Sequence, residues 1–290
     1  MYKTINIVFY IIISTMLLAC TEILEDIPSS NENVNGFNVT WRNNVTDKQK
    51  DAIREIINDM QYVEGGTFLM GATQEQEPYA RKNEKPAHYV QLSDYYINKH
   101  EISIQQLEAL LDKEFSTYER NHGAPQYTWT DWNKVLNLIY EYSGVEFDFP
   151  TEAQWEYAAR GGNKGNGYIY SGGNSISSID NSENELGLIG MARSHSEWCK
   201  DAFNEYSGLP LEIDPYYVQG LGHVIRGGNE KSVEEMKDYF DTRFSSKDKF
   251  SNVYKDIRSC RVSARSYGDD SHAYLGIYIS CRLVINIKQK

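Results

Sequence analysis

Four segments of the chain place apolar residues along one side of a helix. Three of them begin with Ser or Thr followed three residues later by Gln, a pattern in which the two side chains bond N–H groups that the first helical turn leaves unpaired. These three predicted helices follow Thr46, Ser103 and Thr151, and a fourth runs from about residue 130 to residue 142, ahead of Gly144. All four are short, so a long helical bundle is not expected.

Between these segments, short runs alternate apolar and polar residues in the manner of half-buried β-strands. The runs lie at residues 67–70, 88–92, 95–97, 223–225 and 283–287. The predicted helices and strands do not alternate regularly, which argues against a doubly wound parallel sheet. The pattern predicts a fold of the α+β class.

Residues 1–19 predict a signal peptide. Lys3 precedes an apolar run from Ile7 to Ala19, which is shorter than the roughly 20 residues that a membrane-spanning helix needs. The run ends in Leu-Leu-Ala-Cys20, which resembles the lipobox of bacterial lipoproteins, where the signal is cut before a cysteine that then receives a diacylglycerol. Cys20 is therefore the predicted lipidation site, and the lipid bilayer is a predicted partner.

The residues after Cys20 bear on location and on the start of the folded domain. Thr21 stands where an aspartate would resemble the inner-membrane retention signal, so the resemblance favours the outer membrane, on either its periplasmic or its surface face. Residues 20–45 are rich in Asn and Ser and have little apolar periodicity, which predicts a lipidated flexible tether. The domain proper is expected over residues 46–290.

Composition and charge narrow the class of partner. Of the 290 residues, 40% are hydrophobic and 24% are charged, which suits a packed globular domain. The formal net charge of −12 would repel a polyanion. Nucleic acid is therefore not an expected partner.

Nine blocks between Tyr62 and Val284 form an ordered series. They are residues 62–71, 84–92, 96–103, 149–162, 184–188, 197–199, 226–228, 260–265 and 282–284. The longest reads Phe-Pro-Thr-Glu-Ala-Gln-Trp-Glu-Tyr-Ala-Ala-Arg-Gly-Gly. The series resembles the formylglycine-generating enzyme family, also called sulfatase-modifying factors. The resemblance implies a C-type-lectin-like α+β domain with little regular secondary structure.

The resemblance also says where catalysis would lie. In active members two cysteines a few positions apart bind copper and supply the oxidising step, and on this chain the second would fall near Ile257. No cysteine occurs between Gly228 and Ser259, and no other residue type there replaces thiolate, the soft ligand for copper(I). We expect no catalytic residues and no cofactor, and hence a pseudoenzyme that has lost formylglycine synthesis.

The block that resembles the family's calcium site is altered as well. Where the family usually reads Asp-Met-Ser-Gly-Asn-Val-Trp-Glu-Trp, this chain reads Gly-Met-Ala-Arg-Ser-His-Ser-Glu-Trp over residues 190–198. Ser194 replaces the ligand asparagine, Arg193 adds an opposing charge, and only Glu197 keeps an oxygen donor. Because calcium takes six to eight oxygens, no metal site is expected.

Three cysteines remain beyond Cys20, at positions 199, 260 and 281. An exported chain meets an oxidising compartment, so one disulfide is expected. The resemblance favours Cys199 with Cys260, since both lie in blocks that commonly carry cysteine together in bacterial relatives. The other two pairings stay open.

The candidate binding chemistry lies in a tyrosine-rich stretch, residues 266–274. Its Tyr, Ser, Asp and Gly content is typical of binding surfaces that combine rigid aromatic area with adaptable polar contacts, and it resembles the diversified final loops of display proteins with this fold. The candidate ligand-binding residues are Tyr267, Asp269, Asp270, His272 and Tyr274. An ordinary tyrosine-rich surface is the plain alternative.

The expected function is therefore binding of a protein or carbohydrate ligand at the cell envelope by a non-catalytic domain. Two alternatives remain: an active formylglycine-generating oxidase, and a structural component of an outer-membrane gliding or secretion assembly. Arg261, Arg265 and Arg282 are expected to hold irregular loops, because a guanidinium presents five donors in a fixed fork.

Overall fold

The computed structural model describes residues 29–77, 79–175, 183–192, 194–228, 260–269 and 278–287. Its helices are α2 (Asp47–Asn58), α3 (Ile104–Leu111), α4 (Thr117–His122), α5 (Trp129–Ser143) and α6 (Glu152–Ala159), with short 3-10 helices η2 (Lys82–Glu84) and η3 (Gly162–Lys164). The four helices predicted from the sequence are confirmed as α2, α3, α5 and α6. The capping boxes at Thr46, Ser103 and Thr151 are formed. The apolar pattern did not predict α4, although Ser116 starts it with the same kind of box.

The strands are short. They are β1 (Ser29–Val34), β2 (Phe37–Arg42), β3 (Met60–Val63), β4 (Gly66–Met70), β5 (His88–Leu92), β6 (Tyr95–Asn98), β7 (Ser196–Ala202), β8 (Leu211–Ile213), β9 (His223–Arg226), β10 (Ser266–Gly268), β11 (Ile279–Ser280) and β12 (Val284–Asn286). The five strands predicted from alternation are confirmed as β4, β5, β6, β9 and β12.

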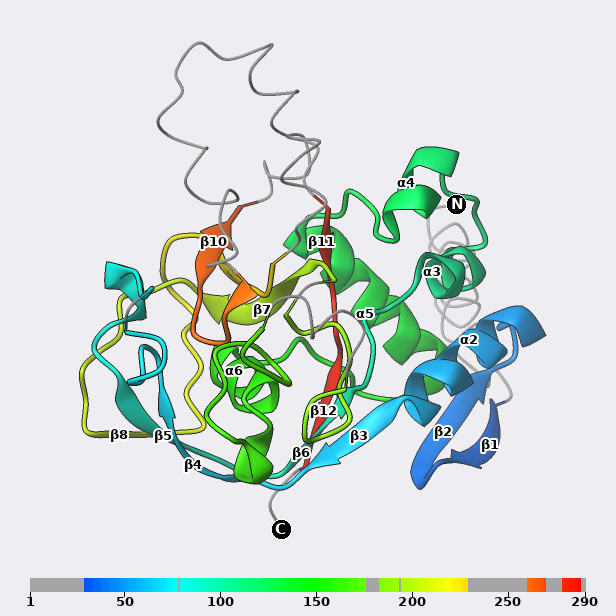
Figure 1. Ribbon diagram of the computed structural model, residues 1–290. Coiled ribbons are helices and arrows are strands. Elements are labelled where there is room, and N and C mark those ends of the chain that lie inside the picture. The colour runs from blue at the N-terminus through cyan, green and yellow to red at the C-terminus, as the bar shows by residue number, and fades with distance from the viewer. Residues whose placement is uncertain are drawn as a thin grey trace, which may run out of the picture.

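Three small sheets and one hairpin take the place of a single continuous sheet (Figure 1). The strand orders are β10-β9-β7-β11, β12-β6-β3 and β4-β5-β8. β11 runs parallel to β7, and β8 runs parallel to β5, whereas the other pairs are antiparallel. Strands from the end of the chain thus lie beside strands from its first half. The architecture confirms the α+β class.

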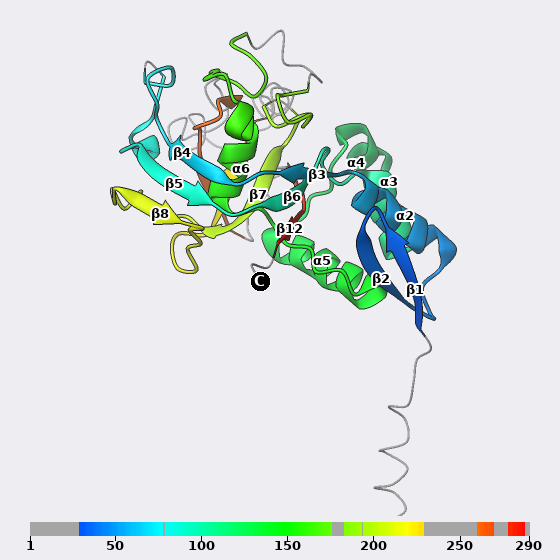
Figure 2. The same ribbon diagram turned by 90° about the horizontal axis from the view of Figure 1, so that it is seen from below.

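Helix α6 lies inside the domain, and all eight of its residues are buried. Figure 2 shows it between the β4–β5 strands and β7. Glu152, Gln154 and Glu156 are therefore polar residues in an apolar core, where an unpaired carboxylate would be costly. Their partners position the segments described in the next section.

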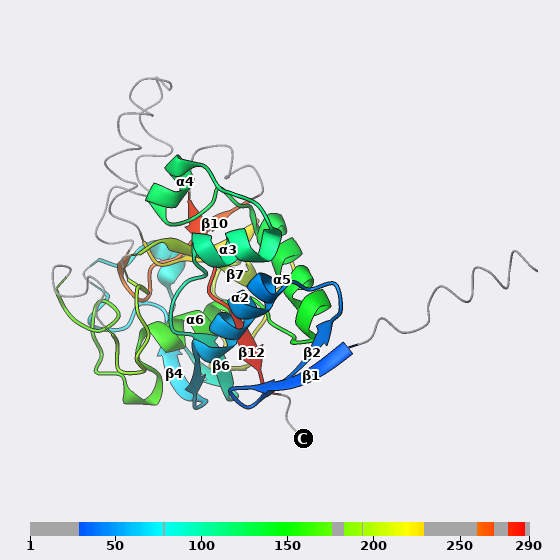
Figure 3. The ribbon, with the colours of Figure 1, turned by 90° about the vertical axis from the view of Figure 1, so that its right-hand side faces the viewer.

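A second core lies under α2, α3 and α5. Figure 3 shows these helices side by side with the β1–β2 hairpin at their edge. The core includes Ile53, Leu107 and Trp132, each with no exposed surface. Within the described ranges, no helix combines the length and the apolar composition needed to cross a bilayer.

The β1–β2 hairpin corrects the predicted tether. Its register pairs β1 with β2 around a turn at Asn35-Gly36, where both residues have positive φ angles of 50° and 88°, as a tight hairpin turn requires. Val39 and Trp41 alternate into the core and are 1% and 2% exposed. The tether prediction is wrong for residues 29–42, because these alternating apolar residues bury themselves despite the Asn-rich composition around them. The domain begins before residue 46.

Candidate functional site

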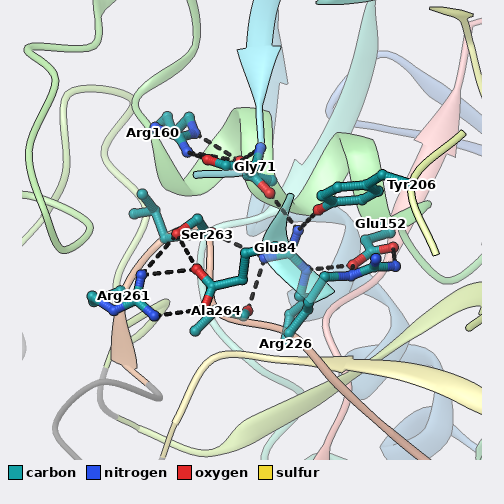
Figure 4. A network of polar contacts seen from close by, with 12 residues as sticks. Gly71, Glu84, Glu152, Arg160, Tyr206, Arg226, Arg261, Ser263 and Ala264 are labelled. Atoms are coloured by element: carbon teal, nitrogen blue, oxygen red, sulfur yellow. Dashed lines mark hydrogen bonds and ion pairs between the residues drawn. The ribbon is translucent and has the colours of Figure 1, made fainter. Parts of the chain in front are cut away.

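Arg226 of β9 lies at the centre of a buried network of arginines and carboxylates (Figure 4). Its guanidinium donates to Glu152 at 2.9 Å and pairs with Glu156, so it binds two residues of α6. It also donates to the carbonyl oxygens of Val262 and Ala264, at 3.0 and 2.9 Å. One buried side chain thus joins α6, β9 and the segment that leads into β10.

Two further arginines extend this network. Arg265 donates to both carboxylate oxygens of Glu152, at 2.7 and 2.5 Å. Arg261 donates to Glu84 at 2.8 and 2.6 Å, and Ser263 also donates to Glu84 at 2.6 Å. Burial alone would raise the pKa of Glu84, but the hydrogen bonds from Arg261 outweigh burial and hold the pKa below its ordinary value. The prediction that Arg261 and Arg265 hold irregular loops is confirmed.

Arg282 likewise holds irregular segments together, next to β6. It donates to Glu197 at 3.0 and 3.1 Å and to the carbonyl oxygens of Asn98 and Ile189, at 2.8 Å each. Trp155 of α6 donates to the second oxygen of Glu197 at 2.8 Å. Glu197, the one residue that matched an oxygen donor of the family's calcium site, therefore has both oxygens engaged by donors of this chain.

The altered calcium block instead holds a charged histidine. His195 Nδ1 lies 2.7 Å from Glu101 Oε2, and its Nε2 lies 2.7 Å from the carbonyl oxygen of His122. Both ring nitrogens face acceptors, so both carry protons. Burial would lower the pKa of His195, but the Glu101 carboxylate outweighs burial and raises the pKa to about 9. The ring is a cation at neutral pH. Arg193 lies outside the described residues.

Ser194 also approaches His195, but the geometry is not that of a nucleophile and its base. Ser194 Oγ lies 3.2 Å from His195 Nδ1, the same nitrogen that bonds Glu101. A catalytic Ser-His-acid array places the serine and the acid on opposite ring nitrogens. The cluster ties α4 to the block at residues 190–198 and does not activate a hydroxyl.

The described cysteines are buried thiols rather than members of a disulfide. The predicted Cys199–Cys260 disulfide is therefore wrong for this structure: each of the two sulfurs lies in packed surroundings as a thiol. Burial raises the pKa of Cys199 and of Cys281 well above its ordinary value. Because copper(I) is held by thiolate, these thiols do not fit the copper pair of the family's active members.

The predicted ligand-binding stretch is described only in part. Tyr267 lies on β10 with 46% of its surface exposed, and its ring lies 4.7 Å from that of Phe203. Asp269 is exposed at the end of β10. The other three candidates lie outside the described residues; they are Asp270, His272 and Tyr274. The structure thus places Tyr267 on β10 and Asp269 directly after it, both exposed, and the rest of this prediction stays a prediction.

A row of exposed apolar side chains lies elsewhere, on the outer face of the β4-β5-β8 sheet. Leu69, Tyr89 and Leu211 are paired across the three strands, and Ile213 follows on β8. Their exposed fractions are 36%, 54%, 45% and 67% in that order. We call these four residues the outer sheet face. A contiguous apolar surface of this kind marks interaction sites in soluble proteins.

Strand β8, which supplies half of the outer sheet face, is held firmly. Asp214, at its end, accepts hydrogen bonds of 2.7 Å from both the backbone and the hydroxyl of Ser93. Glu212, between the two exposed residues of β8, accepts a 2.6 Å hydrogen bond from Tyr217. The face is therefore presented by a braced strand rather than by a loose loop.

Sequence reasoning missed the outer sheet face. The only local signal was the alternation of Leu209, Leu211 and Ile213, which is too short to stand out from a loop. The partners on β4 and β5 lie more than a hundred positions away, and only the strand register brings them into line.

Comparison with known proteins shows which family the domain resembles. A family model described as the sulfatase-modifying factor enzyme 1-like domain matches residues 45–254. The chain is 26% identical over 229 residues to a serine/threonine-protein kinase pkn1 of Chlamydia pneumoniae, a match that covers 65% of this chain and 36% of the kinase. It is 23% identical over 210 residues to the chaperone protein LppX of Paenibacillus barcinonensis, covering 50% of this chain and 71% of that protein. The chain thus spans about a third of the length of the kinase.

Two solved structures show the same fold. Treponema denticola variable protein 1 has a TM-score of 0.55 at 16% identity, covering 88% of this chain and 98% of its own. PvdO from Pseudomonas aeruginosa has a TM-score of 0.53 at 17% identity, covering 78% and 93%. At these identities the likeness concerns the fold alone.

Proposed function

This chain belongs to the family of sulfatase-modifying factor enzyme 1-like domains, and from that membership we propose that it is a member without oxidase activity that holds a protein partner on its outer sheet face. In this proposal Cys20 carries the lipid that anchors the chain in the outer membrane. The proposal that the chain binds a protein partner rests on the outer sheet face. The proposal that it has no oxidase activity rests on its cysteines.

The loss of oxidation is supported by the state of the thiols. The segment from Gly228 to Ser259, where active members place their pair, has no cysteine in the sequence. Cys199 and Cys281 have no exposed surface and raised pKa values, so the thiolate that would bind copper is disfavoured in both. The cation at His195, within the altered calcium block, also opposes a calcium ion there.

The docking function is supported by the shape and the chemistry of the outer sheet face. The row from Leu69 through Tyr89 to Leu211 spans three strands spaced about 4.8 Å apart. A flat apolar row on a braced sheet suits an interface core, where large aromatic and aliphatic side chains supply most of the binding energy. Arg261, which donates to Glu84 in the segment before β5, fixes the chain that leads into this sheet.

A photo-crosslinking experiment tests the docking function. A photo-reactive amino acid at Ile213, in the full lipidated chain and in intact membranes of the source cell, is expected to yield one discrete adduct. Tyr140, 53% exposed on α5, is the matched control position and is expected to yield none. Leu211→Lys should abolish the Ile213 adduct. Equal labelling at both positions, or none at Ile213, contradicts docking at this face.

A separate assay tests the loss of oxidation. The purified chain, supplied with copper, is incubated with a cysteine-containing sulfatase peptide. No formylglycine is expected. Measurable formylglycine would contradict this half of the proposal and leave the docking result standing.

A further inference from the structure

A cavity of about 400 Å³ opens at the end of the outer sheet face, between the start of β4 and the end of β5. Thr67 and Gln91, which are paired across these strands, form its polar side, and Gln91 is in turn paired with Ile213 of the outer sheet face. Ser93 and Asp94 also line it, and Ile287 contributes an apolar side chain. The cavity thus continues the docking surface with a change from apolar to polar.

Asp94 gives the cavity its charge. Tyr62 donates a 2.6 Å hydrogen bond to one carboxylate oxygen of Asp94, and the backbone N–H of Gly65 donates a 2.8 Å bond to the other. These two bonds lower the pKa of Asp94, so the group is ionised at neutral pH. Each oxygen still has a lone pair for a further donor.

The other walls of the cavity leave this charge uncompensated. None of the residues lining it is Lys, Arg or His. Thr67 and Gln91 are exposed and supply further acceptors, the Thr67 hydroxyl and the Gln91 amide oxygen. A negative site with several acceptors and one apolar wall suits a donor-rich cation on an alkyl stem.

We propose that this cavity binds an alkyl guanidinium or alkyl ammonium group. The cationic head donates to Asp94 and to the Gln91 amide oxygen, and the alkyl stem packs against Ile287. This inference goes beyond the docking function and stands without it, because the free cation is itself the ligand. The same chemistry comes from two sources, a small free amine or an arginine or lysine side chain of a docked partner.

Titration calorimetry of the full chain with butylguanidinium tests the site, and butylurea, its uncharged counterpart of nearly the same shape, tests the role of charge. Saturable binding of butylguanidinium is expected, with butylurea at least about tenfold weaker, because its N–H donors lack the positive charge that strengthens a hydrogen bond to a carboxylate. Asp94→Asn should weaken the guanidinium about tenfold. Glu114→Gln, at an exposed carboxylate on another part of the chain, should leave it unchanged.

Gln91→Lys keeps the test decisive if Asp94→Asn fails to fold. The substituted residue is exposed, and its own ammonium should fill the cavity and abolish binding of butylguanidinium. An absence of saturable binding, equal binding of butylurea, or undiminished binding in Asp94→Asn or Gln91→Lys would overturn the proposal.

A second arm distinguishes the two sources of the cation. An extended peptide that carries arginine flanked by leucines is compared with butylguanidinium. If a partner side chain is the source, the peptide should bind more tightly, and Ile213→Lys should remove only the gain. If a free amine is the source, the two ligands should bind equally and Ile213→Lys should change neither. In both cases butylguanidinium binds, so the cation site is supported. A loss of butylguanidinium binding contradicts the cation site, whereas an absence of crosslinking at Ile213 contradicts docking, and the two results can be told apart.

Discussion

Gly222 packs closely against the backbone of Gly268, so that a Cβ atom on Gly222 would come within 2.3 Å of the carbonyl oxygen of Gly268. Gly222 also has a φ angle of 60° in the left-handed region. The contact brings the end of the loop before β9 against the end of β10, the strand that presents Tyr267. The two glycines thus set how closely these segments approach.

Gly222→Ala is expected to destabilise the chain by about 2–4 kcal/mol, through left-handed strain and a forced shift of the backbone at Gly268. Gly167→Ala is the matched control, because Gly167 has a similar φ of 70° with open space at the Cβ position. It should cost only about 1 kcal/mol. Urea unfolding monitored by tryptophan fluorescence measures both, and equal losses would show that the close approach carries no cost.

The charged His195 predicts a specific dependence of stability on pH. Its folded pKa of about 9 lies above the ordinary value of 6.5, so the folded state holds the proton more tightly. The stabilisation is complete below pH 6.5 and is lost as the pH rises through 9. We expect the free energy of unfolding to fall by about 3 kcal/mol across this window.

The control for this pH dependence is His195→Gln, which cannot titrate. The difference between the two unfolding profiles isolates the histidine from groups that both proteins share. If the wild type and the variant have parallel profiles between pH 6.5 and 9, the imidazole is not the cation that the geometry at Glu101 implies.

Arg226 tests the buried network. Arg226→Met leaves Glu152 and Glu156 without their common partner inside the core, and removal of one member of a buried pair typically costs about 3–5 kcal/mol. Arg120→Met removes an ion pair with Glu108 whose arginine is 40% exposed, and it should cost at most about 1 kcal/mol. Thermal and urea unfolding compare the two variants, and similar losses would contradict the central role of Arg226.

The hairpin predicts that the domain cannot be shortened to the start of the family match. A chain beginning at residue 43 lacks Val39 and Trp41, which are buried in the core. We expect it to lose at least the roughly 3–5 kcal/mol typical of deleting one buried aromatic side chain. A chain beginning at residue 29 keeps the hairpin and should match one that begins at residue 21. Melting temperatures of the three chains, together with Trp41→Ala, test this.

The thiols give a chemical test of the corrected disulfide. If Cys20 is lipidated as proposed, the chain denatured without reductant is expected to show three reactive thiols, from Cys199, Cys260 and Cys281. In the native chain Cys199 and Cys281 should react slowly with a thiol reagent, because burial raises their pKa and blocks access. A single reactive thiol in the denatured chain would instead show that two of the three cysteines are joined in a disulfide.

Much of the fold could be predicted from local patterns. The capping boxes at Thr46, Ser103 and Thr151 and the alternation in β5 are signals contained within a few residues, and all were confirmed. Strand β7 could not be predicted, because it is buried on both faces and includes Glu197 and Asp201. Burial of Glu197 depends on Arg282, a partner 85 positions away that no local pattern reveals.

Less of the candidate site than of the fold could be predicted from the sequence. The tyrosine-rich stretch was found from composition, but only Tyr267 and Asp269 fall within the described residues. The outer sheet face joins β8 to β4 and β5, more than a hundred positions earlier, and the cavity beside it joins the ends of β4 and β5 to Ile287 near the end of the chain. Asp94 became a candidate only when Tyr62 and Gly65 were seen to donate to it.

The early start of β1 limits how far the folded body can stand from an anchored Cys20. From Cys20 to Ser29 there are nine peptide steps, 29 minus 20, and even a fully stretched chain covers only about 3.5 Å in each. The connection from residue 20 to β1 can therefore reach no further than about 30 Å. If Cys20 is lipidated as proposed, the start of β1 lies within about 30 Å of the lipid headgroups, and a large soluble assembly would approach the domain from the side turned away from the bilayer.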